Sequence, residues 1–277
     1  RMAEVLEVDP EKKHVLTSIG EIGYDYLVLA TGSRTNYFGL KDLESRALSM
    51  KTLPDAMELR NIILENFEKA LLTTSFEERE RLMTFVIIGG GPTGVELAGA
   101  LEELKKIVLP HDHPELDLKK MRIHLVDMMD RLLVYMSPEA SKSAQKFLAA
   151  RDVNIWLQAK VLSYDGQKVA LSNGKSIQSG NVIWAAGVAG AVPAGFQDKS
   201  LAGGRIRTDV FGCVEGYTNI FTIGDVAAVV AERTPRGYPM LAPVAIQQAK
   251  LLAGNLKKVL SGRKTLKPFV YHDLGVM

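Results

Sequence analysis

The stretch "VIIGGGPTGVELAGAL", residues 86–101, decides how this chain folds. It begins inside an apolar run at 85–88 that is rich in β-branched residues, as a buried parallel strand requires. Glycines follow at positions 89, 91 and 94, and residues 93–108 are predicted to form a helix. A buried strand, a turn with the spacing G-x-G-x-x-G and a helix form the pattern that places a pyrophosphate at a helix start.

Each of the three glycines has its own task in such a turn. Gly89 permits the tight turn, Gly91 lets the backbone approach a pyrophosphate, and Gly94 lets the helix pack closely on the strand. The start of the helix offers N–H groups and a partial positive charge to the phosphates. The spacing alone is a weak signal. Its place between a predicted strand and a helix favours a dinucleotide site over a glycine-rich turn without a ligand.

An acidic residue at the end of the next predicted strand indicates which dinucleotide is bound. Asp127 ends the segment "MRIHLVD", where a carboxylate can hydrogen-bond the adenosine ribose hydroxyls of NAD. It lies farther from Gly94 than the usual spacing of about 20 residues, because the insertion at 108–120 intervenes. Arg131 leaves NADP open, although the acid would repel a 2′-phosphate. Asp127 as a surface acid at a strand end is the other reading.

Predicted helices and strands alternate around this unit. A helix at 54–72, with Thr52 as its cap, comes before it, and a helix at 138–151 and a strand at 153–157 come after it. This alternation predicts an α/β fold with a Rossmann-like, doubly wound parallel sheet.

The chain also contains an internal repeat. Residues 159–187, "AKVLSYDGQKVALSNGKSIQSGNVIWAAG", resemble residues 3–32, "AEVLEVDPEKKHVLTSIGEIGYDYLVLATG". Each copy predicts a three-stranded β meander followed by an apolar strand. In the second copy the glycine-rich turn lies well ahead of the meander, so the turn of a full first copy would lie before Arg1. We therefore expect an NAD-binding domain at 82–190, inserted in an incomplete FAD-binding domain. Residues 1–81 would form the rear part of that domain and a helical connector, and residues 191–277 its returning part.

A second strand followed by an acid lies near the end of the chain. In "NIFTIGDVAAV", Gly224 and Asp225 follow a predicted strand, where an acid can bind the ribityl chain of a flavin, although a plain strand-end turn is the alternative. A helix is expected from about Pro243, and its dipole would stabilise an anionic reduced flavin. Its expected apolar side consists of Ala245, Ala249, Leu252, Leu256 and Leu260.

Composition excludes several other classes of protein. The formal net charge is +2, from 34 basic and 32 acidic residues spread along the chain, so nothing indicates nucleic-acid binding. The single Cys213 rules out an internal disulfide and is expected to be half-buried. Glycines and a proline break the longest uncharged run, at 176–197, so no membrane span is predicted. His111 and His113 are expected in a solvated loop, and no metal site is predicted.

With these residues in view, the chain resembles type II NADH dehydrogenase, a single-subunit NADH:quinone oxidoreductase of the flavoprotein superfamily with two dinucleotide-binding domains. The superfamily's pyridine nucleotide-disulfide oxidoreductases share the general motifs. The likeness runs along the whole chain and is carried by "YDYLVLATGSRTNYFG", "MKTLPDA", "GGGPTGVELAG", "VIWAAGV", "IFTIGDVA" and "VAIQQ".

The resemblance assigns roles to particular residues. The residues implied for NADH are Gly89, Gly91, Gly94 and Asp127, with Ala186 and Gly187 beside it. Those implied for FAD are Thr31, Gly32, Gly224 and Asp225. Glu96 would lie near the nicotinamide and the flavin, with a suggested role in quinone protonation, and Gln247 and Gln248 would border the quinone.

It also implies an activity, partners and a location. The protein would pass hydride from NADH to FAD and electrons on to a quinone, at the cytoplasmic face of a membrane to which a tail after Met277 would attach it, and the family allows a homodimer. The chain alone is expected to bind NADH but not FAD, because the first glycine-rich turn would lie before Arg1. Ala242-Pro243 stands where the family usually has Ala-Gln, which puts one quinone contact in doubt, and Asp127 stands where Glu is more usual.

Two alternatives remain at this stage. The first is another flavin-dependent reductase of the superfamily, acting on disulfides, ferredoxin or sulfide and quinone. The single Cys213 argues against the types that carry cysteines in the NAD domain. The second is a chain that binds a nucleotide and catalyses nothing.

Overall fold

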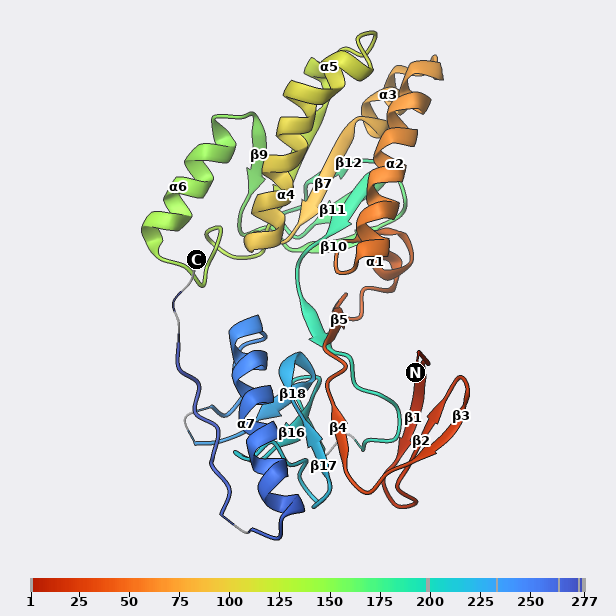
Figure 1. Cartoon of the computed structure of the whole chain (residues 1–277). Helices are drawn as coiled ribbons and strands as arrows, with labels where there is room; N and C mark the ends of the chain where they lie inside the picture. Colours follow the sequence, from red (N-terminus) through yellow and green to blue (C-terminus); the bar gives the residue numbers. More distant parts are fainter. Residues whose placement is uncertain (1, 198–199, 233, 264, 274, 276–277) are drawn as a thin grey trace. The chain divides into compact units, whose positions relative to one another are not determined.

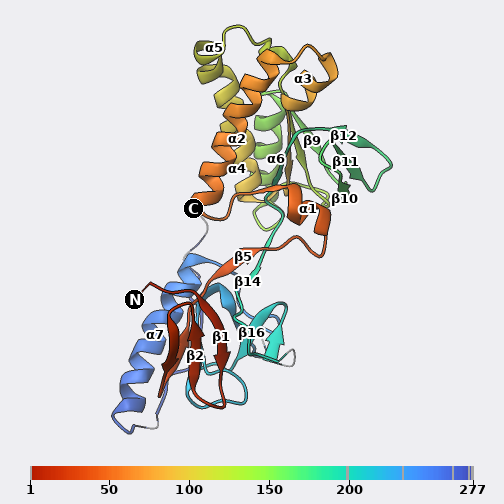
Figure 2. The ribbon, with the colours of Figure 1, turned by 90° about the vertical axis from the view of Figure 1, so that its right-hand side faces the viewer.

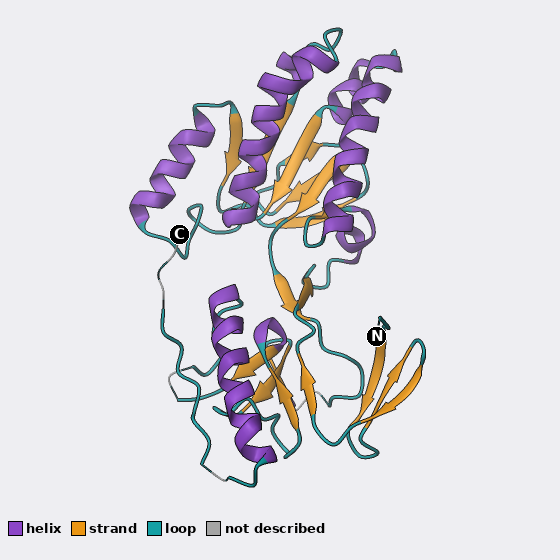
Figure 3. Ribbon diagram, in the orientation of Figure 1, coloured by secondary structure: helices purple, strands orange, loops and turns teal. Residues whose placement is uncertain are grey.

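The computed structural model describes residues 2–197, 200–232, 234–263, 265–273 and 275, and divides the chain into two compact units. One unit is formed by residues 35–187, and the other by residues 1–34 together with 188–277 (Figure 1). Each unit combines helices and strands (Figure 3). Among the described residues, no helix has both the length and the apolar character needed to cross a bilayer.

The unit at 35–187 is built on a five-stranded parallel sheet. Its strands lie in the order β6, β13, β7, β8, β9, and every neighbouring pair is parallel. The order places the glycine-rich turn after the central strand. The bounds are β6 Leu48–Ser49, β13 Asn181–Trp184, β7 Thr84–Ile88, β8 Arg122–Val126 and β9 Val153–Trp156.

Helices α2, α4 and α6 cover one face of this sheet, and the meander of the second repeat copy covers the other together with α1 (Figure 2). Side chains alternate along β7, so that Phe85 and Ile87 pack with the helices while Val86 and Ile88 pack under the meander. All five residues of β7 are buried, as its apolar sequence predicts. The meander consists of β10 Val161–Tyr164, β11 Lys168–Leu171 and β12 Ser176–Gln178.

The helices of this unit begin and end close to the predicted positions. Thr52 caps the long helix α2 with a capping box, in which its hydroxyl accepts the Asp55 N–H at 3.3 Å and the Asp55 carboxylate accepts the Thr52 N–H at 2.9 Å. The helix predicted at 93–108 is divided, because its last turn widens into a π-helix. The bounds are α1 Lys41–Arg46, α2 Leu53–Leu72, α3 Phe76–Leu82, α4 Pro92–Glu103, π-helix Leu104–Val108, α5 Leu109–Asp112, 3₁₀-helix Leu118–Lys120 and α6 Pro138–Ala149.

The compact units divide the chain at different residues from the expected domains. Residues 35–81 pack with the parallel sheet, and the rings of Phe67 in α2 and Phe85 in β7 lie 5.9 Å apart. The sequence did not reveal this packing, because the apolar stripe of α2 shows that the helix is buried without showing against which sheet. The divisions between the compact units fall at 34/35 and 187/188, and the domain boundaries expected at 81/82 and 190/191 stay a prediction.

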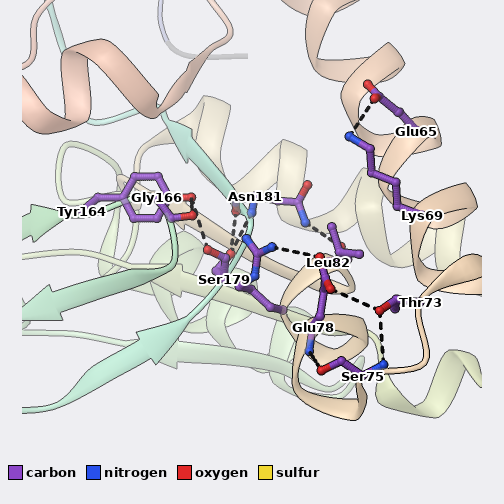
Figure 4. A network of polar contacts seen from close by, with 11 residues as sticks. Glu65, Lys69, Thr73, Ser75, Glu78, Leu82, Tyr164, Gly166, Ser179 and Asn181 are labelled. Carbon is purple, nitrogen blue, oxygen red and sulfur yellow. Dashed lines mark hydrogen bonds and ion pairs between the residues drawn. The ribbon is translucent and has the colours of Figure 1, made fainter.

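A network of buried polar side chains lies at the amino ends of β7 and β13, where it hydrogen-bonds the backbone (Figure 4). Asn66 of α2 donates to the side chain of Asn181 at 2.6 Å, and Asn181 donates to the Leu82 carbonyl at 2.7 Å. The Ser179 hydroxyl donates to the Thr84 carbonyl at 2.7 Å. These side chains satisfy backbone groups that would otherwise be buried without partners.

The unit at 1–34 and 188–277 contains the first copy of the repeat. Strands β1 Val5–Asp9, β2 His14–Thr17 and β3 Gly20–Gly23 form the expected antiparallel meander. The apolar strand after each meander joins a parallel pair, β4 with β17 here and β13 with β7 in the other unit. The remaining elements are β4 Leu27–Leu29, β5 Ser33–Thr35, β14 Val188–Gly190, β15 Leu201–Ala202, β16 Arg205–Thr208, β17 Ile220–Thr222, 3₁₀-helix Gly224–Val226, β18 Ala227–Val229 and α7 Ala242–Leu260.

The structure differs from the sequence prediction at one face of α7 and at one histidine. The buried face of α7 is formed by Val244, Gln248, Leu252 and Asn255, while Ala249 and Leu260 of the expected stripe are exposed. The expected stripe was wrong because Gln248 and Asn255, which are polar, lie on the buried face and form hydrogen bonds there. His113 is buried against Phe67, not solvated.

Candidate functional site

The backbone of the glycine-rich turn is fixed by close contacts at its two outer glycines. Gly89 has a φ of +116°, and a Cβ there would lie 2.6 Å from the carbonyl carbon and oxygen of Ala185. A Cβ on Gly94 would lie 1.8 Å from the carbonyl oxygen of Gly89. Both contacts exclude any other residue, so these two glycines set the tight turn and the close approach of α4 to the sheet.

The middle glycine faces open space instead. Gly91 is the N-cap of α4 with φ −74°, and a Cβ built on it would meet nothing within 4 Å. Steric packing and backbone strain therefore do not require glycine at this position. The first turn of α4 carries Pro92 and no acidic side chain, so the positive end of the helix dipole is not neutralised there. This surface can accept an anion that approaches the backbone closely.

Asp127, which follows β8, hydrogen-bonds the backbone of the glycine-rich turn after β7. Its carboxylate accepts the backbone N–H of Gly90 and, at 2.7 Å, that of Met129. The contact with Gly90 was not predicted, because residues distant in sequence give no signal of which N–H a carboxylate will reach. A carboxylate has about four lone-pair sites, so Asp127 retains capacity for ribose hydroxyls.

The carboxyl ends of three adjacent strands bring these residues together. The Gly89 N–H donates to the Val126 carbonyl of β8, and the Ala185 N–H after β13 donates to the Ile88 carbonyl of β7, each at 2.8 Å. A Cβ on Gly89 would lie 2.7 Å from the Cα of Ala186. Ala186 is thus adjacent to the turn, and Gly187 follows it in the chain.

Glu96 lies on the exposed side of the first turns of α4. The residues that α4 buries are Gly94, Leu97, Ala98, Leu101 and Glu102. Glu96 is exposed, so its carboxylate does not pack on the sheet. Its expected approach to a nicotinamide stays a prediction.

The residues expected around a flavin gather in the other unit. The Asp225 carboxylate accepts the Ser33 hydroxyl at 2.6 Å, next to Gly32. The Thr31 hydroxyl and the Gly32 carbonyl both bond the backbone of Ala191, at 2.6 and 2.9 Å. Ser33 was missed by the sequence analysis, although it lies inside the quoted segment "LATGSR".

The two glutamines of α7 have different partners. Gln248 is 5% exposed, and its side-chain oxygen accepts the Gly224 N–H at 2.7 Å. Gln247 is partly exposed and makes two hydrogen bonds to the backbone of His272, at 2.8 and 3.0 Å. Gln248 therefore supports the turn that carries Asp225. Gln247 is the more exposed of the two and is the more accessible to a ligand.

Cys213 is half-buried, as expected, and its thiol donates to the Tyr217 carbonyl at 3.0 Å. Burial, with a smaller contribution from Asp209, raises the pKa of this thiol to about 11. The thiol is therefore protonated at neutral pH and a poor nucleophile. Among the described residues, no group of three His, Cys, Asp or Glu side chains could hold a metal ion.

Comparison with known proteins supports the resemblance seen in the motifs. The family model described as pyridine nucleotide-disulphide oxidoreductase matches residues 1–249. The type II NADH:quinone oxidoreductase NdhA of Mycobacterium tuberculosis is 33% identical, over all of this chain and 61% of that protein. The type II NADH:quinone oxidoreductase of Staphylococcus aureus is 30% identical, over 99% of this chain and 68% of that protein. The resemblance to type II NADH dehydrogenases is thus confirmed.

Solved structures share the fold. An NDH2 from Plasmodium falciparum in complex with NADH matches with a TM-score of 0.74 and 22% identity, over 82% of this chain and 50% of that one. A ferredoxin reductase from Rhodopseudomonas palustris matches with a TM-score of 0.75 and 20% identity, over 99% and 60%. Because both classes share the fold, the fold alone does not choose between them. The chain spans about three fifths of the length of the Mycobacterium tuberculosis relatives.

Proposed function

We propose that the protein containing this chain, which belongs to the pyridine nucleotide-disulphide oxidoreductase family, works as an NADH:quinone oxidoreductase with FAD as its flavin. The curated relatives with this activity support the choice over the ferredoxin reductases, which are similar in fold. The observation that carries the proposal is the open face at Gly91, between two glycines that close contacts fix.

The residues at the carboxyl edge of the parallel sheet fit an NADH molecule. A pyrophosphate would lie at the start of α4, where Gly91 leaves the backbone uncovered. Asp127 would bind the ribose hydroxyls and repel a 2′-phosphate, which favours NADH over NADPH. Ala186 and Gly187 would lie along the cofactor from the end of β13.

The other unit offers residues that fit part of a flavin. Asp225 is oriented by Ser33, and the turn before it is held by Gln248 through the Gly224 N–H. Thr31 and Gly32 lie at the end of the neighbouring strand β4 and complete this group. Asp225 would bind the ribityl hydroxyls. A bound flavin supplies the hydride and electron chemistry of such enzymes, and the protein supplies binding and orientation.

Glu96 and Gln247 are the proposed residues of the acceptor side. Glu96 has an exposed carboxylate near the start of α4 and would exchange protons with the quinone. Gln247 would hydrogen-bond a quinone oxygen, and Gln248 would act through the turn that it supports. Because quinones of electron-transfer chains dissolve in membranes, the proposal includes a peripheral location at the cytoplasmic face of a membrane. A homodimer is compatible with it.

A pair of matched variants tests the nucleotide site. Gly91→Glu places a carboxylate on the open face, where its Cβ meets nothing, and Gly99→Glu does the same farther along α4. NADH binding, measured by calorimetry, should be lost in the first variant and retained in the second, with both folded by circular dichroism. Equal NADH affinity in the two variants would contradict this site.

The activity has its own test. FAD is added to a form of the protein that also carries the glycine-rich turn for the FAD pyrophosphate, and oxidation of NADH by menadione is followed by the absorbance of NADH. Turnover that needs FAD and that fails in Gly91→Glu is the expected result. NADH binding without any FAD-dependent turnover in that form would leave only a nucleotide-binding function and would overturn the proposed activity.

A further inference from the structure

A cavity lies at the amino ends of two strands of the parallel sheet, the opposite end from the glycine-rich turn. Its volume is about 740 Å³, and its lining includes the first residues of β8 and β9, Arg122 and Val153. This volume is within the range of small-molecule sites, roughly 300–1,000 Å³. Nothing in the proposed NADH or flavin chemistry uses this end.

Basic side chains dominate the polar lining of the cavity. Lys105, Lys106, Lys119 and Arg122 line it, against one carboxylate, that of Asp152. The Lys106 ammonium lies 2.6 Å from the buried Glu102 carboxylate, so its charge is compensated within the fold. The Arg122 guanidinium lies 3.9 Å from Glu80, at the limit of an ion pair, and 61% of its side chain is exposed.

Lys105 is fixed in the wall of the cavity. Its ammonium donates to the Met121 carbonyl at 2.8 Å, which leaves two of its three N–H groups for other acceptors. Among the described residues, neither Lys105 nor Lys119 lies within ion-pair distance of a carboxylate. Burial lowers the pKa of Lys105, because its charge is partly removed from water without a close counter-ion.

Apolar residues also line the cavity, among them Leu118, Met121 and Val153, and Asn154 lies beside them. An anion at the basic side would compensate the charges of Lys105, Lys119 and Arg122, which lie on three different segments. Phosphate oxygens suit such a set, because several ammonium and guanidinium groups can bind one phosphate group or chain.

We propose that this cavity, lined by Lys105, Lys119 and Arg122, is a binding site for a phosphate-bearing ligand, separate from the nucleotide site at Gly91. Compensation of the three positive charges drives the binding, so affinity falls as salt is raised. The phosphate comes either from a small solute that enters the cavity or from the headgroup of an anionic lipid at its mouth.

The first test uses tripolyphosphate, which carries the phosphate chemistry without a nucleoside. Titration into the ¹⁵N-labelled chain should give saturable shifts of the Lys105, Lys119 and Arg122 amides in NMR spectra. The double variant Lys119→Ala/Arg122→Ala should weaken this binding at least tenfold. Its matched control, Lys142→Ala/Lys146→Ala, removes two exposed lysines of α6 and should leave the binding unchanged. NADH affinity in both double variants reports that the fold is intact.

The second arm separates the two sources of phosphate. Flotation is measured with vesicles of phosphatidylcholine and with vesicles that contain an equal part of phosphatidylglycerol. Binding only to the anionic vesicles, lost in Lys119→Ala/Arg122→Ala, assigns the site to lipid headgroups, and tripolyphosphate binding without flotation assigns it to a solute. The proposal is overturned if neither probe binds, if the shifts are confined to residues 89–94, or if the two double variants bind equally well.

Discussion

Polar groups are arranged differently at the two ends of the central strand β7. At its amino end, Asn66, Ser179 and Asn181 are buried, and their side chains bind one another and the backbone. At its carboxyl end, the turn at 89–94 has no side chain on Gly91 and leaves the helix start open. Polar residues that satisfy each other hold a fold together, whereas backbone groups left open are available to a ligand.

Stability and NADH binding are therefore expected to depend on different residues. Changes in the buried network of Asn66, Ser179 and Asn181 should lower the free energy of unfolding and leave NADH affinity unchanged while the chain is folded. Changes at the open face of the carboxyl end should do the reverse. Gly94 and Asp127 belong to both groups, since each holds the turn in place and borders the open face.

The largest effect is expected for Gly94→Ala. The new Cβ would meet the Gly89 carbonyl oxygen at 1.8 Å, so α4 must move away from the sheet. We expect a loss of roughly 3 kcal/mol in the free energy of unfolding, at the upper end for overpacking, measured by urea denaturation. NADH binding should become undetectable.

Gly99→Ala is the control for that variant. It lies on the same helix, and its Cβ would meet nothing within 4 Å. Alanine should stabilise α4 slightly, because glycine is the poorer helix former. A Gly94→Ala protein as stable as the Gly99→Ala protein would show that the close contact with Gly89 is wrong.

Asn181→Leu should be next in size. It leaves the Asn66 amide and the Leu82 carbonyl buried without partners, and we expect a combined cost of about 2 kcal/mol, from the lower end of the range for each unsatisfied group. NADH affinity, measured by calorimetry below the unfolding transition, should change less than twofold. The double variant Asn66→Leu/Asn181→Leu should recover part of the lost stability, because both polar partners are then gone. A large loss of NADH affinity in Asn181→Leu would break the distinction between the two ends.

Asp127→Ala should weaken NADH binding by about 1–3 kcal/mol, the range for a lost hydrogen bond to a charged group. It should also narrow the preference for NADH over NADPH, because the carboxylate that repels a 2′-phosphate is gone. Asp127→Asn retains acceptor capacity for Gly90 while it removes the charge, so it separates the two contributions. If wild-type chain binds NADPH as tightly as NADH, Asp127 has no role in selectivity.

Glu96→Gln should have the smallest effect on stability and on NADH affinity, because the carboxylate is exposed. In stopped-flow experiments with a full-length protein that holds FAD, we expect slower reduction of the quinone than in wild type and little change in reduction of the flavin. Equal rates for both half-reactions in the two proteins would leave Glu96 with no role beyond favourable charge near a helix start.

Local sequence patterns predicted the parts of the molecule that depend on neighbouring residues. The turn at 89–94, the cap at Thr52 and the two meanders follow from glycine spacing, capping residues and alternation, which are properties of short segments. What the patterns could not show depends on contacts between distant residues. The bond from Asp127 to Gly90, the burial of Gln248 and His113, and the packing of residues 35–81 on the parallel sheet are all of this kind.

The central claim is that the carboxyl ends of the strands bind NADH while the buried polar network of Asn66, Ser179 and Asn181 only supports the fold. Titration of NADH into the ¹⁵N-labelled chain, followed by amide shifts in NMR spectra, tests it most directly. We predict saturable shifts at the glycines of residues 89–94, Asp127, Ala186 and Gly187, and none at Asn66, Ser179 or Asn181. Saturable binding that shifts the amides of the buried network and leaves the glycines of residues 89–94 unchanged would contradict the account.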